Sequence, residues 1–443
     1  MNRNIIRYAL VLIAAFMFAG LGGWYFFLNQ QTQTITATDT SRGLGTSDSS
    51  FASAVGNTYD NIVSGITTLI GGNGTSTVET NNGAPPQLWK ITKTPVAGMA
   101  FVDNAASTKL YFAESSTGYI LTADPGTGAI ARITNKLFPK TYEVVFGRGG
   151  SVVLRSIDEE GVITNFSGTL SRVGTTTSEV KAGDITFTGK NLERNIQGIV
   201  SAPYTREILY VRRSPSGGAL GVRSSWDGTK QKTVFSSPLS GWEPVSLLDG
   251  ATFFVLRPAD NVPGFAYKLG SDGSLSKEVG DVPGLTFLPN ASSTAILYGA
   301  SANGELALFA RVRSDATAFS LPIRTVADKC VWSTEVTSPT QSTTTPKVST
   351  KKPVPVVKPL VAYCAVPQFI VSNTFLNDWY RGAIHTSDSW WRVDVSAGTV
   401  ELLLSPSPSE TIDVEDPAMD DSGRYIAFTN ARDKTLWILR IAK

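Results

Sequence analysis

The stretch KLYFAESSTGYILTADPGTGAIARIT, residues 109–134, decides the fold. It contains three short runs rich in β-branched and aromatic residues, KLYFAES, GYILTAD and AIARIT. Ser-Ser-Thr-Gly and Asp-Pro-Gly-Thr-Gly separate these runs, which is typical of tight turns between antiparallel strands. GMAFVD, residues 98–103, precedes them, so the sequence predicts a four-stranded meander. Because one such sheet cannot cover both of its own faces, copies of it must stack.

Similar groups of four strand-like runs recur along the chain. They occupy residues 142–173, 196–237, 243–280 and 284–323. A sixth group starts with KCVWST and LVAYCAVP and is completed by SWWRVDV and TVELLLS, and a seventh contains IDVEDPAMD, RYIAFTN and TLWILRI. Four strands in each period of about 35–50 residues indicate a β-propeller. The sequence therefore predicts an all-β protein with seven blades, with six or eight blades as the alternatives.

The seventh group is one strand short, because the chain ends after TLWILRI. An unpaired apolar edge of this kind is normally covered. QLWKIT, residues 87–92, alternates like a strand and has no place in the first sheet. We predict that it pairs with TLWILRI and closes the ring. Depending on register, Leu88 and Ile91, or Trp89 and Ile91, then pack against the seventh blade.

The N-terminal segment predicts a membrane anchor. Residues 8–28 carry no charge and are long enough to cross a bilayer as a helix, whereas residues 1–7 contain Arg3 and Arg7. The positive-inside rule places the N-terminus in the cytoplasm and the rest of the chain outside the cytoplasmic membrane. A cleaved signal peptide is the alternative, and the length of the apolar run disfavours it.

Two other segments lack the composition of a folded core. Residues 29–86 are rich in Ser, Thr, Gly and Asn and predict a flexible tether. Apolar residues at three- and four-residue spacing within 49–70 predict an amphipathic helix that pairs with its copies or lies on the membrane, or else a marginal helix in the tether. Residues 335–359, which interrupt the sixth group, are rich in Pro, Thr and Lys and predict a disordered insert.

Composition argues against several functions. The net charge of +2 lacks the strong basic field of a nucleic-acid binder. Two cysteines, one histidine and four methionines are few of the usual metal and redox ligands. We expect no metal and no cofactor.

Some segments resemble known propeller repeats. DDSGRYIAFTN followed by TLWILRI resembles the PD40/TolB-like and WD40-like blades of bacterial envelope proteins. The order of one anchor helix, PVAG, KCVW, YCAVP, DWYRG and a terminal LWILRI is similar to a group of membrane-anchored propeller proteins from candidate-phylum bacteria. The resemblance covers residues 87–443 and implies a fold and a cell-envelope location, but no activity. The Gly-His signature of WD40 blades is missing, and a Trp-Asp pair occurs only once, at Trp226–Asp227.

Cys330 and Cys364 are the only cysteines, and both lie in strand-like contexts. If their strands are neighbours, the two Cβ atoms come within range of a disulfide, and an extracytoplasmic location permits oxidation. We predict this disulfide; two buried free thiols are the alternative. A zinc site is disfavoured, because two thiols without nearby histidines fall short of a ligand set.

Two polar features are considered as a catalytic site and as a metal site. His385 has Asp388 nearby in sequence, but the chain has no G-x-S-x-G elbow, so we interpret His385 as a surface or structural residue. The run IDVEDPAMDD is interpreted as a solvated strand edge and turn, with a calcium site as the alternative. Its acids are Asp413, Glu415, Asp416, Asp420 and Asp421.

The candidate binding site is the long connection FIVSNTFLNDWYRGAIHTSDSWW, residues 369–391. Trp, Tyr and Arg are enriched in binding hot spots, and long loops on rigid scaffolds often carry function. The predicted site residues are Trp379, Tyr380, Arg381 and His385. In the alternative interpretation Trp390 and Trp391 pack within a strand, and Trp379 fills the gap between blades.

Without a catalytic constellation, the sequence favours a non-enzymatic interaction module tethered outside the cytoplasmic membrane. Its expected partner is an envelope protein. The alternatives are a propeller that binds or cleaves a glycan or cell-wall polymer, and a structural role in which copies associate through residues 49–70.

Overall fold

The computed structural model describes residues 86–104, 107–172, 185–202, 205–334, 359–370, 372–407 and 410–441. The expected anchor (8–28), tether (29–86) and insert (335–359) fall almost wholly outside these ranges. No helix among the residues that the structure describes is long and apolar enough to span a bilayer.

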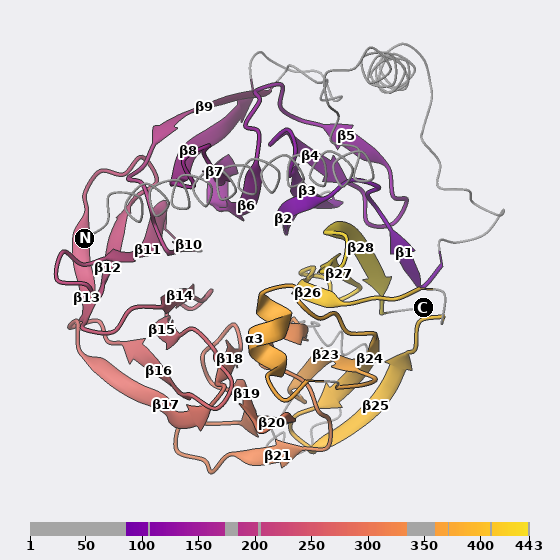
Figure 1. Cartoon of the computed structure of the whole chain (residues 1–443). Coiled ribbons are helices and arrows are strands. Elements are labelled where there is room, and N and C mark those ends of the chain that lie inside the picture. The colour runs from indigo at the N-terminus through magenta and orange to yellow at the C-terminus, as the bar shows by residue number, and fades with distance from the viewer. Residues whose placement is uncertain are drawn as a thin grey trace, which may run out of the picture. The chain divides into compact units, whose positions relative to one another are not determined.

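Seven four-stranded antiparallel sheets form a ring of blades, as predicted (Figure 1). In each blade the first strand lies nearest the centre and the last lies at the rim. Blade 1 contains β2 (Val96–Asn104), β3 (Ser107–Glu114), β4 (Ile120–Ala123) and β5 (Ile130–Arg132); blade 2 contains β6 (Thr141–Phe146), β7 (Ser151–Ile157), β8 (Ile163–Arg172) and β9 (Ile185–Asn191); blade 3 contains β10 (Gly198–Ala202), β11 (Glu207–Arg213), β12 (Ala219–Ser225) and β13 (Lys232–Ser237).

The remaining blades follow the same order. Blade 4 contains β14 (Trp242–Ser246), β15 (Thr252–Leu256), β16 (Pro263–Leu269) and β17 (Leu275–Pro283); blade 5 contains β18 (Thr286–Pro289), β19 (Ile296–Ala302), β20 (Glu305–Arg311) and β21 (Phe319–Leu321); blade 6 contains β22 (Cys330–Trp332), β23 (Val361–Pro367), β24 (Asp388–Asp394) and β25 (Thr399–Leu404); blade 7 contains β26 (Val414–Met419), β27 (Tyr425–Asn430), β28 (Thr435–Arg440) and the N-terminal β1 (Leu88–Lys90). Short helical elements are η1 (Arg148–Gly150), η2 (Ala327–Lys329) and α3 (Phe375–Tyr380).

The predicted ring closure is confirmed. β1 pairs with β28 at the rim of blade 7, with Leu88 opposite Leu439 and Trp89 opposite Ile438. Because successive side chains point to opposite faces of a strand, Leu88 packs into the interface with blade 6 and Trp89 into the interface with blade 1. The two ends of the domain are therefore joined within one sheet.

The predicted strands of blade 2 were partly wrong. Residues 163–172, within the predicted group 142–173, form the single long strand β8, and the fourth strand, β9, lies beyond that group. Gly168 lies within β8, and a Cβ there would lie 2.6 Å from the ring of Phe187 on β9. A glycine that permits a close approach resembles a turn glycine in sequence.

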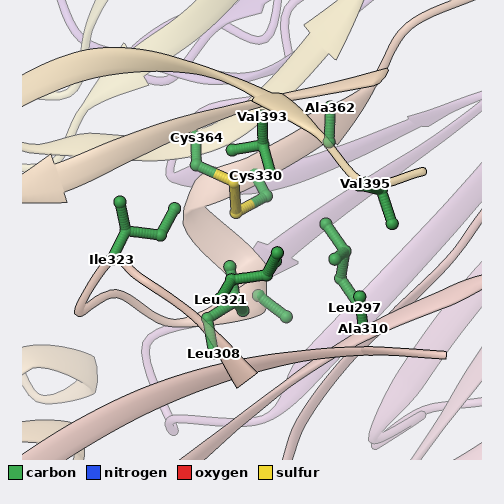
Figure 2. Close-up of a cluster of buried hydrophobic side chains, with 11 residues drawn as sticks. Leu297, Leu308, Ala310, Leu321, Ile323, Cys330, Ala362, Cys364, Val393 and Val395 are labelled. Carbon is green, nitrogen blue, oxygen red and sulfur yellow. A yellow bond between two sulfur atoms is a disulfide. The ribbon is translucent and has the colours of Figure 1, made fainter. Parts of the chain in front are cut away.

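The core is divided among the interfaces between blades, where seven clusters of buried apolar side chains lie. The cluster between blades 5 and 6 contains the predicted disulfide, with Cys330 on β22 directly opposite Cys364 on β23 (Figure 2). The Cα atoms are 4.0 Å apart, and the pair closes a loop of sequence separation 34. The disulfide therefore bridges the base of the segment between β22 and β23.

Candidate ligand-binding site

The connection between β23 and β24 carries α3, which lies on the inside of the ring (Figure 1). Asp378 accepts hydrogen bonds from the hydroxyls of Ser372 at 2.6 Å and Thr374 at 2.7 Å, which closes the first turn of this short helix. Phe375, Leu376 and Trp379 are buried and pack with Leu306 and Val326. This eighth cluster fixes the helix on blades 5 and 6.

A second set of bonds ties α3 to the loop that follows β15 in blade 4. The backbone N–H of Asn377 donates to Oδ2 of Asp260 at 2.9 Å, and the backbone N–H of Asp260 donates to Oδ1 of Asn377 at 3.3 Å. The Ser301 hydroxyl on β19 donates to the other oxygen of Asp260, which is buried. α3 is therefore anchored to three neighbouring blades and forms a rigid platform.

A buried ion cluster lies beneath the platform. Nζ of Lys329 donates to Oδ2 of Asp388 and to Oδ1 of Asp413, both at 2.7 Å, and all three side chains are completely buried. Nζ also donates to the Thr386 hydroxyl at 3.0 Å and lies 4.5 Å from the centroid of the Trp379 ring. The cluster joins the start of blade 6, the connection before β24 and the start of blade 7.

The two carboxylates of the cluster are not equivalent. Burial would raise the pKa of Asp413, but the charge of Lys329 and the hydrogen bonds from Lys329, Thr386 and Trp379 together hold it below its ordinary value. Burial raises the pKa of Asp388 despite the same lysine, and its Oδ1 has no hydrogen-bond partner. Asp413 thus has partners at both of its carboxylate oxygens, whereas Asp388 has them at Oδ2 alone among the residues that the structure describes.

Asp413 corrects one interpretation of the sequence. The acidic run was expected to be solvated, yet Asp413 and Asp420 are completely buried. Oδ1 of Asp420 accepts from the backbone N–H groups of Arg424 and Tyr425, which stabilises the turn before β27. The sequence shows the charges of the run but not Lys329, which lies 84 residues from Asp413.

The four predicted site residues lie in different environments. The Trp379 ring is buried, and its Nε1 donates to Asp413 at 2.9 Å. His385 also contacts Asp413, with Nδ1 3.0 Å from Oδ2, and its side chain is 29% exposed. Tyr380 and Arg381 are exposed. The alternative interpretation, in which the tryptophans pack in the core, therefore holds for Trp379 and for Trp390, which is completely buried.

Tyr380 and Arg381 line a cavity of about 740 Å³, to which strands of several blades contribute. The remaining lining residues are Glu143, Glu243, Arg257, Pro258, Thr374, Asn377 and Glu415. A second cavity, of about 570 Å³, is bounded by blades 1, 2 and 7 and includes Tyr142 and Asp416. Glu415 lines both cavities, so the two adjoin at this residue.

Carboxylates in these walls or directly beside them have raised pKa values. Burial, together with repulsion from Glu243, raises the pKa of Asp328 to about 6, although the Tyr380 hydroxyl donates a hydrogen bond to it. Desolvation and the neighbouring Glu415 raise the pKa of Asp416 to about 7. The Asp416 side chain is exposed to solvent. Its pKa is therefore raised by the protein walls around an open cavity.

Sequence reasoning missed the acidic residues of the cavity walls. Glu143, Glu243 and Glu415 each occur near the start of the innermost strand of a blade, in TYEVVF, WEPVS and VEDPAM. This recurrence was the available signal, because innermost strands of a propeller face the centre of the ring.

No catalytic or metal constellation is evident where the structure is described. Across those ranges no three His, Cys, Asp or Glu side chains are grouped so as to hold a metal ion. His385 has a carboxylate partner, but in the same ranges no serine hydroxyl hydrogen-bonds to it, as a Ser-His-acid triad requires.

Comparison with known proteins identifies no family for this chain. No family model matches the chain, and no curated protein does. Similar solved structures include the Myceliophteria thermophila Cps50 (Swd1) β-propeller domain, with 10% identity, a TM-score of 0.44 and coverage of 80% of this chain and 100% of that one. The Neurospora crassa Pan2 WD40 domain has 9% identity, a TM-score of 0.43 and coverage of 79% and 92%. The β-propeller domain of the Trilobed protease from Pyrococcus furiosus has 9% identity, a TM-score of 0.42 and coverage of 78% and 98%.

Proposed function

We propose that this protein is a non-enzymatic, membrane-tethered propeller that binds a polypeptide partner outside the cytoplasmic membrane, through the cavity beside α3. One observation carries the proposal: Tyr380 and Arg381 are 44% and 69% exposed at this cavity, on a helix anchored to three blades. A rigid Tyr–Arg pair has the composition of a binding hot spot. Little entropy is lost when such a preorganised surface is occupied.

The choice of a polypeptide over a glycan rests on the tryptophans. Trp379 and Trp390 are buried and offer no indole face for sugar stacking, so the exposed aromatic rings of the loop are Phe369 and Tyr380. The extracytoplasmic location is supported by the uncharged run at 8–28 and by the Cys330–Cys364 disulfide, which an oxidising compartment favours.

Site-specific photo-cross-linking tests the binding surface. A photoreactive residue is placed at Arg381 in the full-length chain in its native membranes. The matched control position is Asp272, in the exposed turn between β16 and β17 at the rim. We expect a discrete protein adduct from position 381 and none from position 272. Identical adducts from both positions, or no adduct from position 381, would contradict the proposal.

Thiol labelling tests the location. Because both natural cysteines form the disulfide, Asp272→Cys introduces the single free thiol of the chain. A membrane-impermeant maleimide should label it in intact cells or spheroplasts. Labelling that requires lysis would place the propeller in the cytoplasm.

A further inference from the structure

Most charges in the cavity walls are already paired within single blades. Glu243 pairs with Arg257 at 2.9 Å in blade 4, and Glu415 pairs with Lys434 at 2.5 Å in blade 7. In blade 2, Glu143 pairs with Arg155. Arg381 is also engaged, since it pairs with Asp378 of α3. These pairs leave little net charge for a ligand.

Asp416 is the exception. It lies in a bulge of β26, where Asp416 and Pro417 stand opposite the single residue Phe428 of β27, and its φ is +50°. Its side chain is exposed in the second cavity, and it makes no hydrogen bond or ion pair with any residue that the structure describes. This carboxyl group in a walled space is thus open to a partner.

The surroundings of Asp416 favour a positive partner. The nearby carboxylates of Glu415, Asp328 and Glu143 repel its negative form, and among the bases only Lys434 offsets them appreciably. Lys140 lines the same cavity from the turn before β6, so it forms part of any test. A cation brought to Asp416 relieves the repulsion among four acids.

The walls also contain aromatic rings. Tyr142, 39% exposed, lines the second cavity, and Tyr380, 44% exposed, lines the first. Carboxylates combined with tyrosine faces suit an organic ammonium or guanidinium group, through charge-assisted hydrogen bonds and cation–π contacts. A metal ion fits less well, because no group of three ligands is available among the described residues.

We propose that these adjoining cavities hold a lysine or arginine side chain of the polypeptide partner, with Asp416 as the carboxylate that pairs with it. This inference rests on the proposed function and names the chemistry of the ligand. The two cavities, of about 740 and 570 Å³, have room for one extended side chain and its flanking backbone.

Small peptides test the inference directly. Acetyl-Gly-Lys-Gly-amide and acetyl-Gly-Arg-Gly-amide are titrated into the full-length chain in detergent and observed by saturation-transfer NMR, with acetyl-Gly-Gln-Gly-amide as the neutral probe. Binding of the two cationic peptides, weakened by added salt, is the expected result. Equal binding of the glutamine peptide would overturn the proposal.

The Asp416→Asn variant removes the charge and keeps the shape, and asparagine tolerates a left-handed backbone. We expect it to weaken the cationic peptides by at least about tenfold. Asp281→Asn is the matched control, because Asp281 also has a positive φ, of +61°, but lies on the rim strand β17 with a 72% exposed side chain. Unchanged affinity in Asp416→Asn, or an equal loss in Asp281→Asn, would contradict the assignment. Lys140→Gln should strengthen binding, and weaker binding in that variant would argue against a cationic ligand.

These outcomes are distinct from those of the cross-linking experiment. If position 381 captures a partner and Asp416→Asn leaves that capture unchanged, the cationic side chain is refuted while the proposed function stands. If the peptides bind in an Asp416-dependent way and position 381 captures nothing, the cavity chemistry stands and the proposed function fails.

Discussion

The ammonium group of Lys329 and the carboxylate of Asp413 form an ion pair of 2.7 Å in which both side chains are completely buried. Lys329 ends η2 just before blade 6, and Asp413 immediately precedes β26 of blade 7. Since Asp413 also accepts a hydrogen bond from Trp379, this pair connects two blades with α3. A buried ion pair of this kind imposes one arrangement on the elements that supply it, at a desolvation cost.

Removing the lysine should destabilise the propeller strongly. Lys329→Met leaves Asp388 and Asp413 buried without their cation, so we expect the free energy of unfolding to fall by about 3–5 kcal/mol in a denaturant titration. Lys277→Met, which breaks the exposed Lys277–Asp281 pair, should cost at most about 1 kcal/mol. Similar losses in the two variants would show that the cluster contributes no more than a surface pair.

Neighbouring residues of α3 should respond differently to truncation. Trp379→Ala removes a buried ring and the Nε1 donor to Asp413, so the free energy of unfolding should fall by about 3–5 kcal/mol. Arg381→Ala should change it by less than about 1 kcal/mol, because the side chain is 69% exposed. Thermal unfolding followed by circular dichroism separates the two variants. A stable Trp379→Ala protein would mean that Trp379 is not a core residue and would support a role in ligand contact.

Ring closure should depend on β1. Trp89 is buried and packs edge-on against Tyr425 at 6.3 Å between ring centroids, so Trp89→Ala should cost about 3–5 kcal/mol. Lys90→Ala is the matched control on the same strand, since its ion pair with Asp433 is exposed. A chain that begins at Lys93 should aggregate, because β28 then has a free apolar edge. Normal folding of that chain would mean that the ring closes without β1.

Stability should vary with pH through Asp416. Its pKa rises from an ordinary 3.8 to about 7 on folding, so between these values the folded state binds more protons than the unfolded state. Stability therefore falls as the pH rises from about 4 to about 7, and the lowered pKa of Asp413 acts oppositely only at lower pH. Asp416→Asn should reduce the fall of the melting temperature across that window, to which Asp328, with a pKa of about 6, also contributes. Asp281→Asn is the control. An unaltered pH profile in Asp416→Asn would contradict this reasoning.

Some residues of the candidate site can be recognised from their immediate sequence neighbours, and others only from the folded structure. Tyr380 and Arg381 stood out because they form an unusual local cluster, and they do line the cavity. Trp379 stood out for the same reason and is buried, since sequence does not show which side of a six-residue helix meets the core. Glu143 and Glu243 carried no local signal, and blades far apart in the chain bring them to one space.

The sequence by itself determined the seven blades, the closing strand and the disulfide. Alternating apolar residues, turn residues and repeat length are local properties, and antiparallel neighbours in sequence become neighbours in space. Only the tertiary structure decided that Asp413 is buried and that Asp416 has no partner among the residues that the structure describes. The state of a carboxylate depends on charges that other blades bring within a few ångströms, and Lys329, at a separation of 84 residues from Asp413, becomes its neighbour only when the ring closes.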